Sequence, residues 1–168
     1  MSKKATKPKV EDVLGEVLDG DAQTNALDFV AFLRANKLSP NLAAANSWAV
    51  AYKGQRVCFI RTYGSANYHN LKGGSWHICF ANSKFANFDD EQYNLDEKLK
   101  NLIWDNISHC QNHDYACNPG DPMTIFGKKF DSVCHQWLFM INPDANAVEC
   151  AKKIIMLYIS SILRSKVV

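Results

Sequence analysis

A cation, an imidazole and two thiols recur at alternate positions in the first half of the chain. Arg56 and Cys58 are two residues apart, as are His77 and Cys79, and residues two apart on a β-strand share a face of the sheet. They could form the floor of a pocket for a small ligand, bordered by an aromatic ring. The predicted ligand-binding residues are Arg56, His77, Trp48, Trp76, Cys58 and Cys79. In the alternative, the cysteines pack as small apolar side chains and His77 bonds to a neighbour.

A second candidate site is a group of histidines and cysteines in the second half of the chain. Thiolates and neutral imidazoles bind zinc, which takes four such ligands in a tetrahedron. The candidate metal ligands are His109, Cys110, His113, Cys117 and Cys134. Because the group lacks two clean Cys-x2-Cys pairs, an ordinary loop and a redox pair of Cys110 with Cys117 remain alternatives, and metal binding stays open.

Motifs of the common enzyme classes are missing from the sequence. There is no Gly-x-Ser-x-Gly elbow, no phosphate-binding loop and no dinucleotide fingerprint. Six cysteines and five histidines produce Cys/His pairs by chance, and no local motif marks one thiol as an activated nucleophile. The sequence therefore favours a protein that is not an enzyme and carries no cofactor.

Two hydrophobic periods predict the elements that would position the first group. Apolar residues spaced three and four apart predict helices over 10–18 and 24–36, and Ser39-Pro40 predicts a short helical turn over 39–45. Alternation on both sides of a Lys-Gly turn predicts a β-hairpin over 48–60, followed by a strand over 76–80.

The faces of this hairpin are also expected from the alternation. Phe59 is predicted on the core side with Trp48 and Trp76, and Cys58 on the opposite side with Arg56. That opposite side would be a polar, sulfur-bearing face that helices cover only in part.

The second half of the chain predicts a further helix, further strands and a last helix. Asn94 with Glu97 resembles a capping box for a helix reaching about residue 107, followed by a loop over 109–122. A hairpin over 124–134, a strand over 136–141 and a helix from Asn142-Pro143-Asp144 to Arg164 complete the chain. The predicted order is ααβββαβββα. Such an order indicates an α+β fold, with helices packed on an antiparallel sheet built from hairpins.

Charge and length bound the class of protein. The first ten residues hold four lysines and no acid, whereas the whole chain of 168 residues has a net charge of +2. Residues 1–9 are therefore predicted to be a disordered basic tail, and residues 10–168 a single α+β domain. The folded part has no excess of basic residues, which disfavours a nucleic-acid partner.

The same stretch bears on cellular location. The tail has no apolar segment behind it, so no secretory signal is expected. The longest mostly apolar run, residues 154–163, is shorter than the roughly twenty residues of a membrane helix. We therefore expect a cytoplasmic protein without a membrane partner, whose cysteines are thiols.

The pattern of apolar residues in the last helix predicts contact with a second copy of the chain. Positions 154–159 are apolar all round at 100° per residue, whereas a surface helix has one apolar stripe. This favours a homodimer through the C-terminal helix. In the alternative, neighbouring helices of the same chain cover the second stripe.

The segment from Ser47 to Ile60, SWAVAYKGQRVCFI, resembles the YdhG-like group of small bacterial α+β proteins. The resemblance covers about residues 24–80 and includes two helices before a Trp…Tyr-Lys-Gly hairpin. Members are mostly uncharacterised, and some are described as frataxin-like iron chaperones. The resemblance implies a bacterial source and an α+β fold, and it carries no functional residue onto this chain.

Taken together, these patterns predict a bacterial cytosolic domain that is not an enzyme and binds an unidentified small molecule on its sheet, in a regulatory role. One alternative is a metal-binding or thiol-dependent protein that uses the group over 109–117. The other is a dimeric interaction module.

Overall fold

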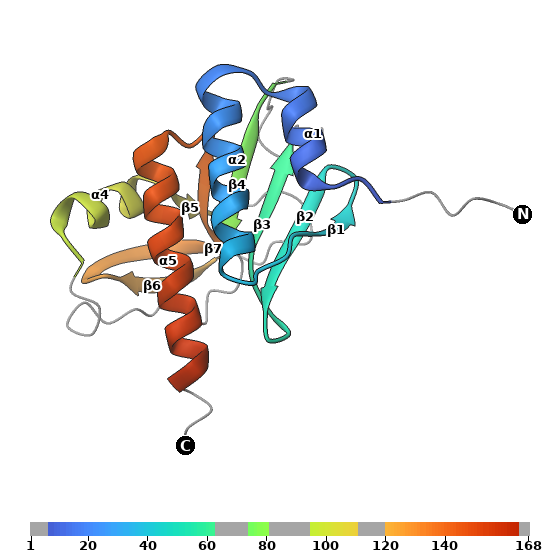
Figure 1. Ribbon diagram of the computed structural model, residues 1–168. Coiled ribbons are helices and arrows are strands. Elements are labelled where there is room, and N and C mark those ends of the chain that lie inside the picture. Colours follow the sequence, from blue (N-terminus) through green and yellow to red (C-terminus); the bar gives the residue numbers. More distant parts are fainter. Residues whose placement is uncertain (1–6, 63–73, 81–94, 111–119, 165–168) are drawn as a thin grey trace, which may run out of the picture.

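The described part of the chain forms one antiparallel sheet with helices on one side of it (Figure 1). The computed structural model describes residues 7–62, 74–80, 95–110 and 120–164. The strands are β1 (Asn41–Ala44), β2 (Ser47–Tyr52), β3 (Gln55–Thr62), β4 (Trp76–Phe80), β5 (Ile107–His109), β6 (Asp121–Ile125) and β7 (Lys128–Ile141). The helices are α1 (Val10–Val17), α2 (Gly20–Ala35), α4 (Glu97–Asp105) and α5 (Ala145–Arg164). The predicted α+β class with an antiparallel sheet is confirmed.

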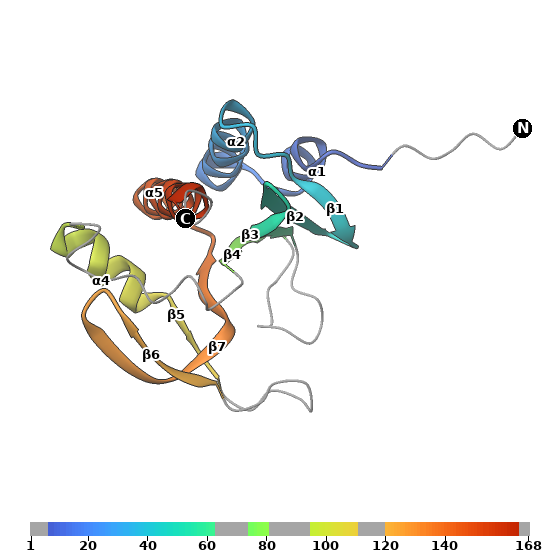
Figure 2. The same cartoon turned by 90° about the horizontal axis from the view of Figure 1, so that it is seen from below.

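The two faces of the sheet have different surroundings. The strand order is β1-β2-β3-β4-β7-β5, and β6 also pairs with β7. Helices α1, α2 and α5 lie on the same side of the sheet, and α4 packs beside α5 near β5 and β6 (Figure 2). We call the side under α1, α2 and α5 the core face and the opposite side the second face. The central strand β4 is buried on both faces.

Aromatic side chains on the core face anchor α5. Trp137 of β7 is fully buried, and its Nε1 donates a hydrogen bond to the Tyr158 hydroxyl of α5 at 2.9 Å. The ring of Tyr158 stacks on Phe80 of β4, with centroids 6.1 Å apart. A buried indole N–H with an acceptor avoids the cost of an unmade hydrogen bond. These contacts position α5 against the sheet.

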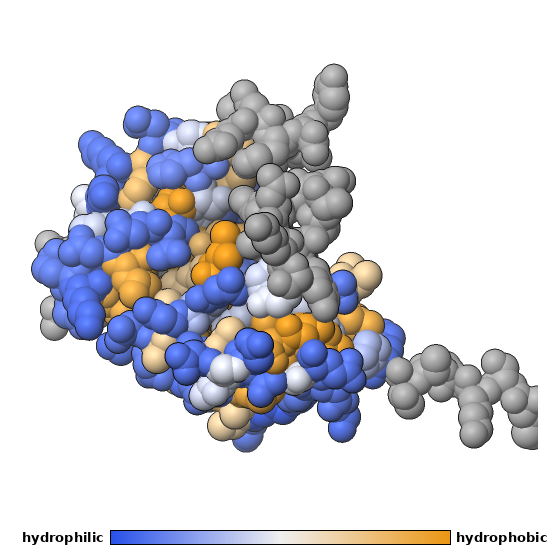
Figure 3. All heavy atoms as spheres, turned by 90° about the horizontal axis from the view of Figure 1, so that it is seen from above, coloured by the Kyte–Doolittle hydropathy of each residue, from blue (hydrophilic) through white to orange (hydrophobic). Residues whose placement is uncertain are grey.

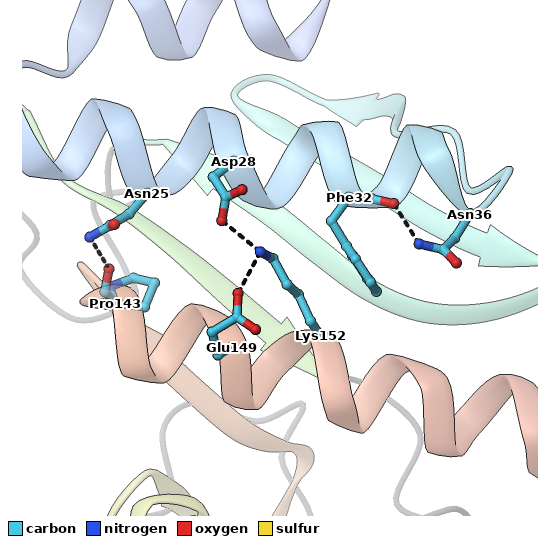
Figure 4. A network of polar contacts seen from close by, with 7 residues as sticks. All are labelled: Asn25, Asp28, Phe32, Asn36, Pro143, Glu149 and Lys152. Atoms are coloured by element: carbon cyan, nitrogen blue, oxygen red, sulfur yellow. Dashed lines mark hydrogen bonds and ion pairs between the residues drawn. The ribbon is translucent and has the colours of Figure 1, made fainter.

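A lysine joins α2 to α5 (Figure 4). The Nζ atom of Lys152 donates to the carboxylates of Asp28 and Glu149, both at 2.6 Å, and lies over the ring of Phe32. Burial lowers the pKa of Lys152, but the hydrogen bonds to Asp28 and Glu149 outweigh burial and leave the pKa above its usual value. The lysine therefore stays charged and neutralises an acid on each helix.

The structure corrects three predicted elements. The helical turn predicted over 39–45 is wrong, because Asn41 and Leu42 pair with Ala49 and Trp48 as the edge strand β1. Ladder hydrogen bonds along β2 outweigh the local helical preference there. The strands predicted over 124–134 and 136–141 are divided differently, because β7 is one continuous strand. Residues 107–109, expected to end a helix and begin a loop, form β5.

The start of α4 also differs in detail. Its N-cap is Asp96, whose Oδ1 accepts a hydrogen bond from the Leu99 amide at 2.8 Å. Asn94, the predicted cap, lies outside the described residues. An aspartate at this position also favours the helix through its dipole.

The predicted tail lies only partly within the described residues. Residues 1–6 are outside them, and the Pro8 carbonyl accepts a hydrogen bond from Trp48 Nε1 at 3.4 Å.

Viewed from above the orientation of Figure 1, much of the surface is hydrophilic, with separate hydrophobic patches (Figure 3). None of the described helices is long and apolar enough to cross a membrane.

Candidate functional site

A β-bulge in β3 decides which side chains reach the second face. Val50 pairs with Cys58, but Ala51 pairs with Arg56, so Val57 is an extra residue in the ladder. Side chains directly opposite each other share a face. Cys58 therefore lies with Val50 on the core face, and the predicted faces of Cys58 and Phe59 are wrong. Alternation counted from Arg56 fails because the bulge adds one residue.

The six predicted ligand-binding residues are divided between the two faces. Trp48, Trp76 and Cys58 lie on the core face, and each is at most 1% exposed. Arg56, His77 and Cys79 are directed to the second face by the strand register. The structure thus brings the cation, the imidazole and one thiol to one face, and it places both tryptophans beneath the helices.

A second arginine, Arg61, forms the centre of a polar network on the second face. Its Nε donates to the Ser47 hydroxyl and its Nη1 donates to Gln136 Oε1, both at 3.3 Å. The Cys79 thiol donates to the same Gln136 oxygen at 3.0 Å. Three strands, β2, β4 and β7, thus supply the neighbours of one arginine on β3. The network fixes the position of a guanidinium that is itself only half-buried.

Two guanidinium groups lie over the ring of Phe59. The Cζ atoms of Arg56 and Arg61 each lie 4.9 Å from its centroid. A guanidinium over an aromatic face is attracted to the negative face of the ring. Arg56 itself is exposed, so one of the two cations faces solvent and the other is held by the network.

Small side chains on β2 border this row. Across the ladder, Ser47 lies opposite Arg61, Ala49 opposite Phe59, and Ala51 opposite Arg56. Ala49 is partly exposed and Ala51 is exposed, whereas the β4 residues on the other side are buried. Over β2 and β3, the accessible part of the second face is therefore the area where these small side chains adjoin the two arginines.

His77 borders the network on the side of β4. It lies opposite Arg61 in the β3–β4 ladder and is 3% exposed. Its ring lies 4.4 Å from that of Phe139, between centroids. His77 is therefore part of the packed base of the second face and is screened from solvent.

The thiols near the centre of the molecule are poor nucleophiles. Burial raises the pKa of Cys79 to about 12, with the Arg61 cation acting in the opposite direction. Burial also raises the pKa of Cys58, and it raises that of Cys150 to about 12. The thiolate is the reactive form. The chemistry available around Arg61 is therefore hydrogen bonding and charge attraction.

The candidate metal ligands are only partly within the described residues. His113 and Cys117 lie outside them. His109 ends β5 with its ring 5.9 Å from that of Phe130, and the Cys110 amide donates to the Ser132 carbonyl. Among the described residues, no group of three or more His, Cys, Asp or Glu side chains could hold a metal ion. Metal binding by the full group stays a prediction.

A cleft lies between α4 and α5. Its volume is about 240 Å³, and its floor includes Leu99, Leu102 and Cys150. Charged side chains of both signs line it, among them Lys98 and Lys153. It offers fewer fixed donors than the second face, because none of its lysines belongs to an ion pair or hydrogen bond within the described residues.

Sequence reasoning misses two residues of the network, Arg61 and Gln136. Arg61 follows Phe59 by two positions, so alternation would include it once Phe59 is placed on the second face. Gln136 comes from β7, far along the chain, and no local pattern points to it. Only the pairing of β4 with β7 brings it to Cys79 and Arg61.

Comparison of the chain with protein-family models, curated proteins and solved structures found no match. The resemblance of residues 24–80 to the YdhG-like group therefore stays a prediction. The function has to follow from the geometry of the second face.

Proposed function

We propose that this protein is a bacterial cytosolic domain that is not an enzyme and binds a small molecule on the second face of its sheet, in a regulatory role. The observation that supports this is the Arg61 network beside the small side chains of β2. Binding sites typically combine a few fixed polar groups with apolar surface. Here the partly exposed Ala49 supplies apolar surface beside the buried ring of Phe59, while Arg61 and Gln136 supply donors.

Some N–H groups of the network have no hydrogen-bond partner among the described residues. A guanidinium has five N–H groups, and only two of those of Arg61 have partners among the described residues. Gln136 uses its carbonyl oxygen twice as an acceptor, and its amide N–H groups have no partner there. A ligand rich in acceptors would use these remaining groups.

A screen for ligands with a blocked variant tests the proposal. We expect saturation-transfer NMR with a collection of small metabolites to find ligands of the wild-type protein. Ala49→Trp should abolish their binding, because the indole would cover the accessible surface at Ala49 beside the two arginines. Ala31→Trp, at an exposed position of α2, is the matched control and should leave binding unchanged.

The thermal midpoint and amide spectrum of each variant establish that it is folded. Ligands that bind wild type and Ala49→Trp equally would contradict a site on the second face, as would a collection in which nothing binds.

A further inference from the structure

We infer that the ligand of the second face carries an oxyanion, a carboxylate or a phosphate, which binds to Arg56 and Arg61 beside Phe59. This inference rests on the proposed function and adds the chemical class of the ligand. It comes from the charges around Phe59, which the internal contacts of the sheet leave unbalanced.

Two cations lie on this face, and neither forms an ion pair with an acid among the described residues. Each guanidinium carbon lies 4.9 Å from the same ring centroid. The two carbons are therefore at most about 10 Å apart, which is about one Debye length at an ionic strength of about 0.1 M. Their positive fields overlap there, so one anion is attracted by both.

No ion pair within the described part of the chain joins an acid to Arg56 or Arg61. The ion pairs in that part of the chain join Arg34 to Glu11, Lys100 to Glu97, and Lys152 to both Asp28 and Glu149. Neither Arg56 nor Arg61 takes part in one. Buried charges are normally paired, and the half-buried Arg61 has no carboxylate partner among the described residues.

Arg61 also has the geometry for an oxyanion. Its Nε and Nη1 are held by hydrogen bonds to Ser47 and Gln136. The orientation of the planar guanidinium is therefore fixed, and with it the direction of its remaining N–H groups. Such forks bind carboxylates and phosphates through paired hydrogen bonds. The Gln136 amide adds neutral donors beside it. Phe59 orients both guanidiniums, so less side-chain freedom is lost on binding.

Matched probes test the charge of the ligand. We would titrate ¹⁵N-labelled wild-type protein with benzoate, benzamide and inorganic phosphate, following the amide resonances of β2 and β3. Benzoate should shift the resonances of Arg56, Phe59 and Arg61, and benzamide, which has the same shape without the charge, should bind at least tenfold more weakly. The phosphate titration distinguishes a general oxyanion site from one selective for carboxylates.

Two variants test the two cations separately. Arg56→Gln removes an exposed cation that makes no hydrogen bond among the described residues, so the fold should be unaffected. Gln136→Glu places a carboxylate next to Arg61, and this carboxylate would neutralise the positive charge of the guanidinium. Each should weaken benzoate binding roughly tenfold or more, as expected for the loss of a charge-assisted contact. Lys129→Gln, which also lowers the net charge by one and lies on β7, should bind like wild type.

The outcomes separate this inference from the proposed function. Equal binding of benzoate and benzamide at the second face would overturn the oxyanion, while a small-molecule site there would stand. Unchanged benzoate binding in both variants, or no shift in β2 and β3 with either anion up to about 20 mM, a concentration that detects even millimolar affinity, would also overturn it. Binding lost in Ala49→Trp but retained in Arg56→Gln and Gln136→Glu would show a neutral site.

Discussion

At the scale of single residues, the central feature is a glutamine oxygen that accepts two hydrogen bonds. Gln136 Oε1 receives the Arg61 guanidinium and the Cys79 thiol. The thiol can donate only while it is protonated, and burial keeps it so by raising the pKa of Cys79 to about 12. The cysteine thus acts as a hydrogen-bond donor, and its sulfur is withheld from chemistry.

This predicts slow alkylation of the buried thiols. In native protein at about pH 8, well below their raised pKa, Cys58, Cys79 and Cys150 should react with iodoacetamide far more slowly than in urea. Peptide mass spectrometry at successive times measures each cysteine separately. Alkylation of Cys79 at the same rate in native and unfolded protein would show that the network is not formed.

At the scale of elements, the helices could be predicted from sequence and the faces of β3 could not. The apolar spacing of residues 10–18 is enough to place α1, because the period of a helix is a local property. The bulge at Val57 arises from pairing with β2, and one extra residue exchanges the two faces of a strand. The sequence therefore predicted the faces of Arg56, His77 and Cys79 together but placed Cys58 and Phe59 on the wrong faces, and whether a ligand binds there stays a prediction. Gln136 was missed for the same reason, since its place depends on a distant strand.

The lysine between α2 and α5 should stabilise their packing. Lys152→Met would leave Asp28 and Glu149 without their shared cation, and we expect a loss of about 1 kcal/mol in the free energy of unfolding. Lys153→Met, one residue along and exposed, is the matched control and should change it by less than about 0.5 kcal/mol. Urea unfolding of both variants measures the difference. Equal effects would mean that the bridge does not stabilise the fold.

The ion pair between α1 and α2 should depend on pH. The hydrogen bond from Arg34 lowers the pKa of Glu11 below its usual value, although burial opposes this. A lowered folded-state pKa stabilises the protein above the usual pKa, and the effect disappears as pH falls through the folded value. The wild type should therefore exceed Glu11→Gln in stability by up to about 1 kcal/mol near pH 7, and this difference should be lost as pH falls through the lowered pKa of Glu11. A difference that does not change with pH would contradict this.

At the scale of the whole molecule, α5 is covered mostly by its own chain. Ile154, Ile155 and Tyr158 are fully buried, because the sheet, α2 and α4 surround the helix. The exposed apolar residues on α5 are Met156 and Leu163, each 42% exposed and two turns apart. The homodimer predicted from sequence stays a prediction, and this stripe is the surface on α5 that it would use.

Such a narrow stripe predicts weak association. Stable interfaces bury about 800 Å² on each partner, so any dimer through Met156 and Leu163 should dissociate at micromolar concentration. Sedimentation equilibrium should give a mass that rises above 18.9 kDa with concentration. The pair of changes Met156→Glu and Leu163→Glu should hold it at the monomer mass. A wild-type mass of one chain throughout would exclude this dimer.

The central claim is that a small molecule binds over β2 and β3, and the location of a bound ligand tests it most directly. Intermolecular NOEs would be measured between a ligand found in the screen and the methyl groups of ¹³C-labelled protein. We expect NOEs to the methyls of Ala49 and Ala51, which border Phe59 and the two arginines on the second face. NOEs to Leu99 and Leu102 instead would place the ligand in the cleft between α4 and α5 and contradict the claim.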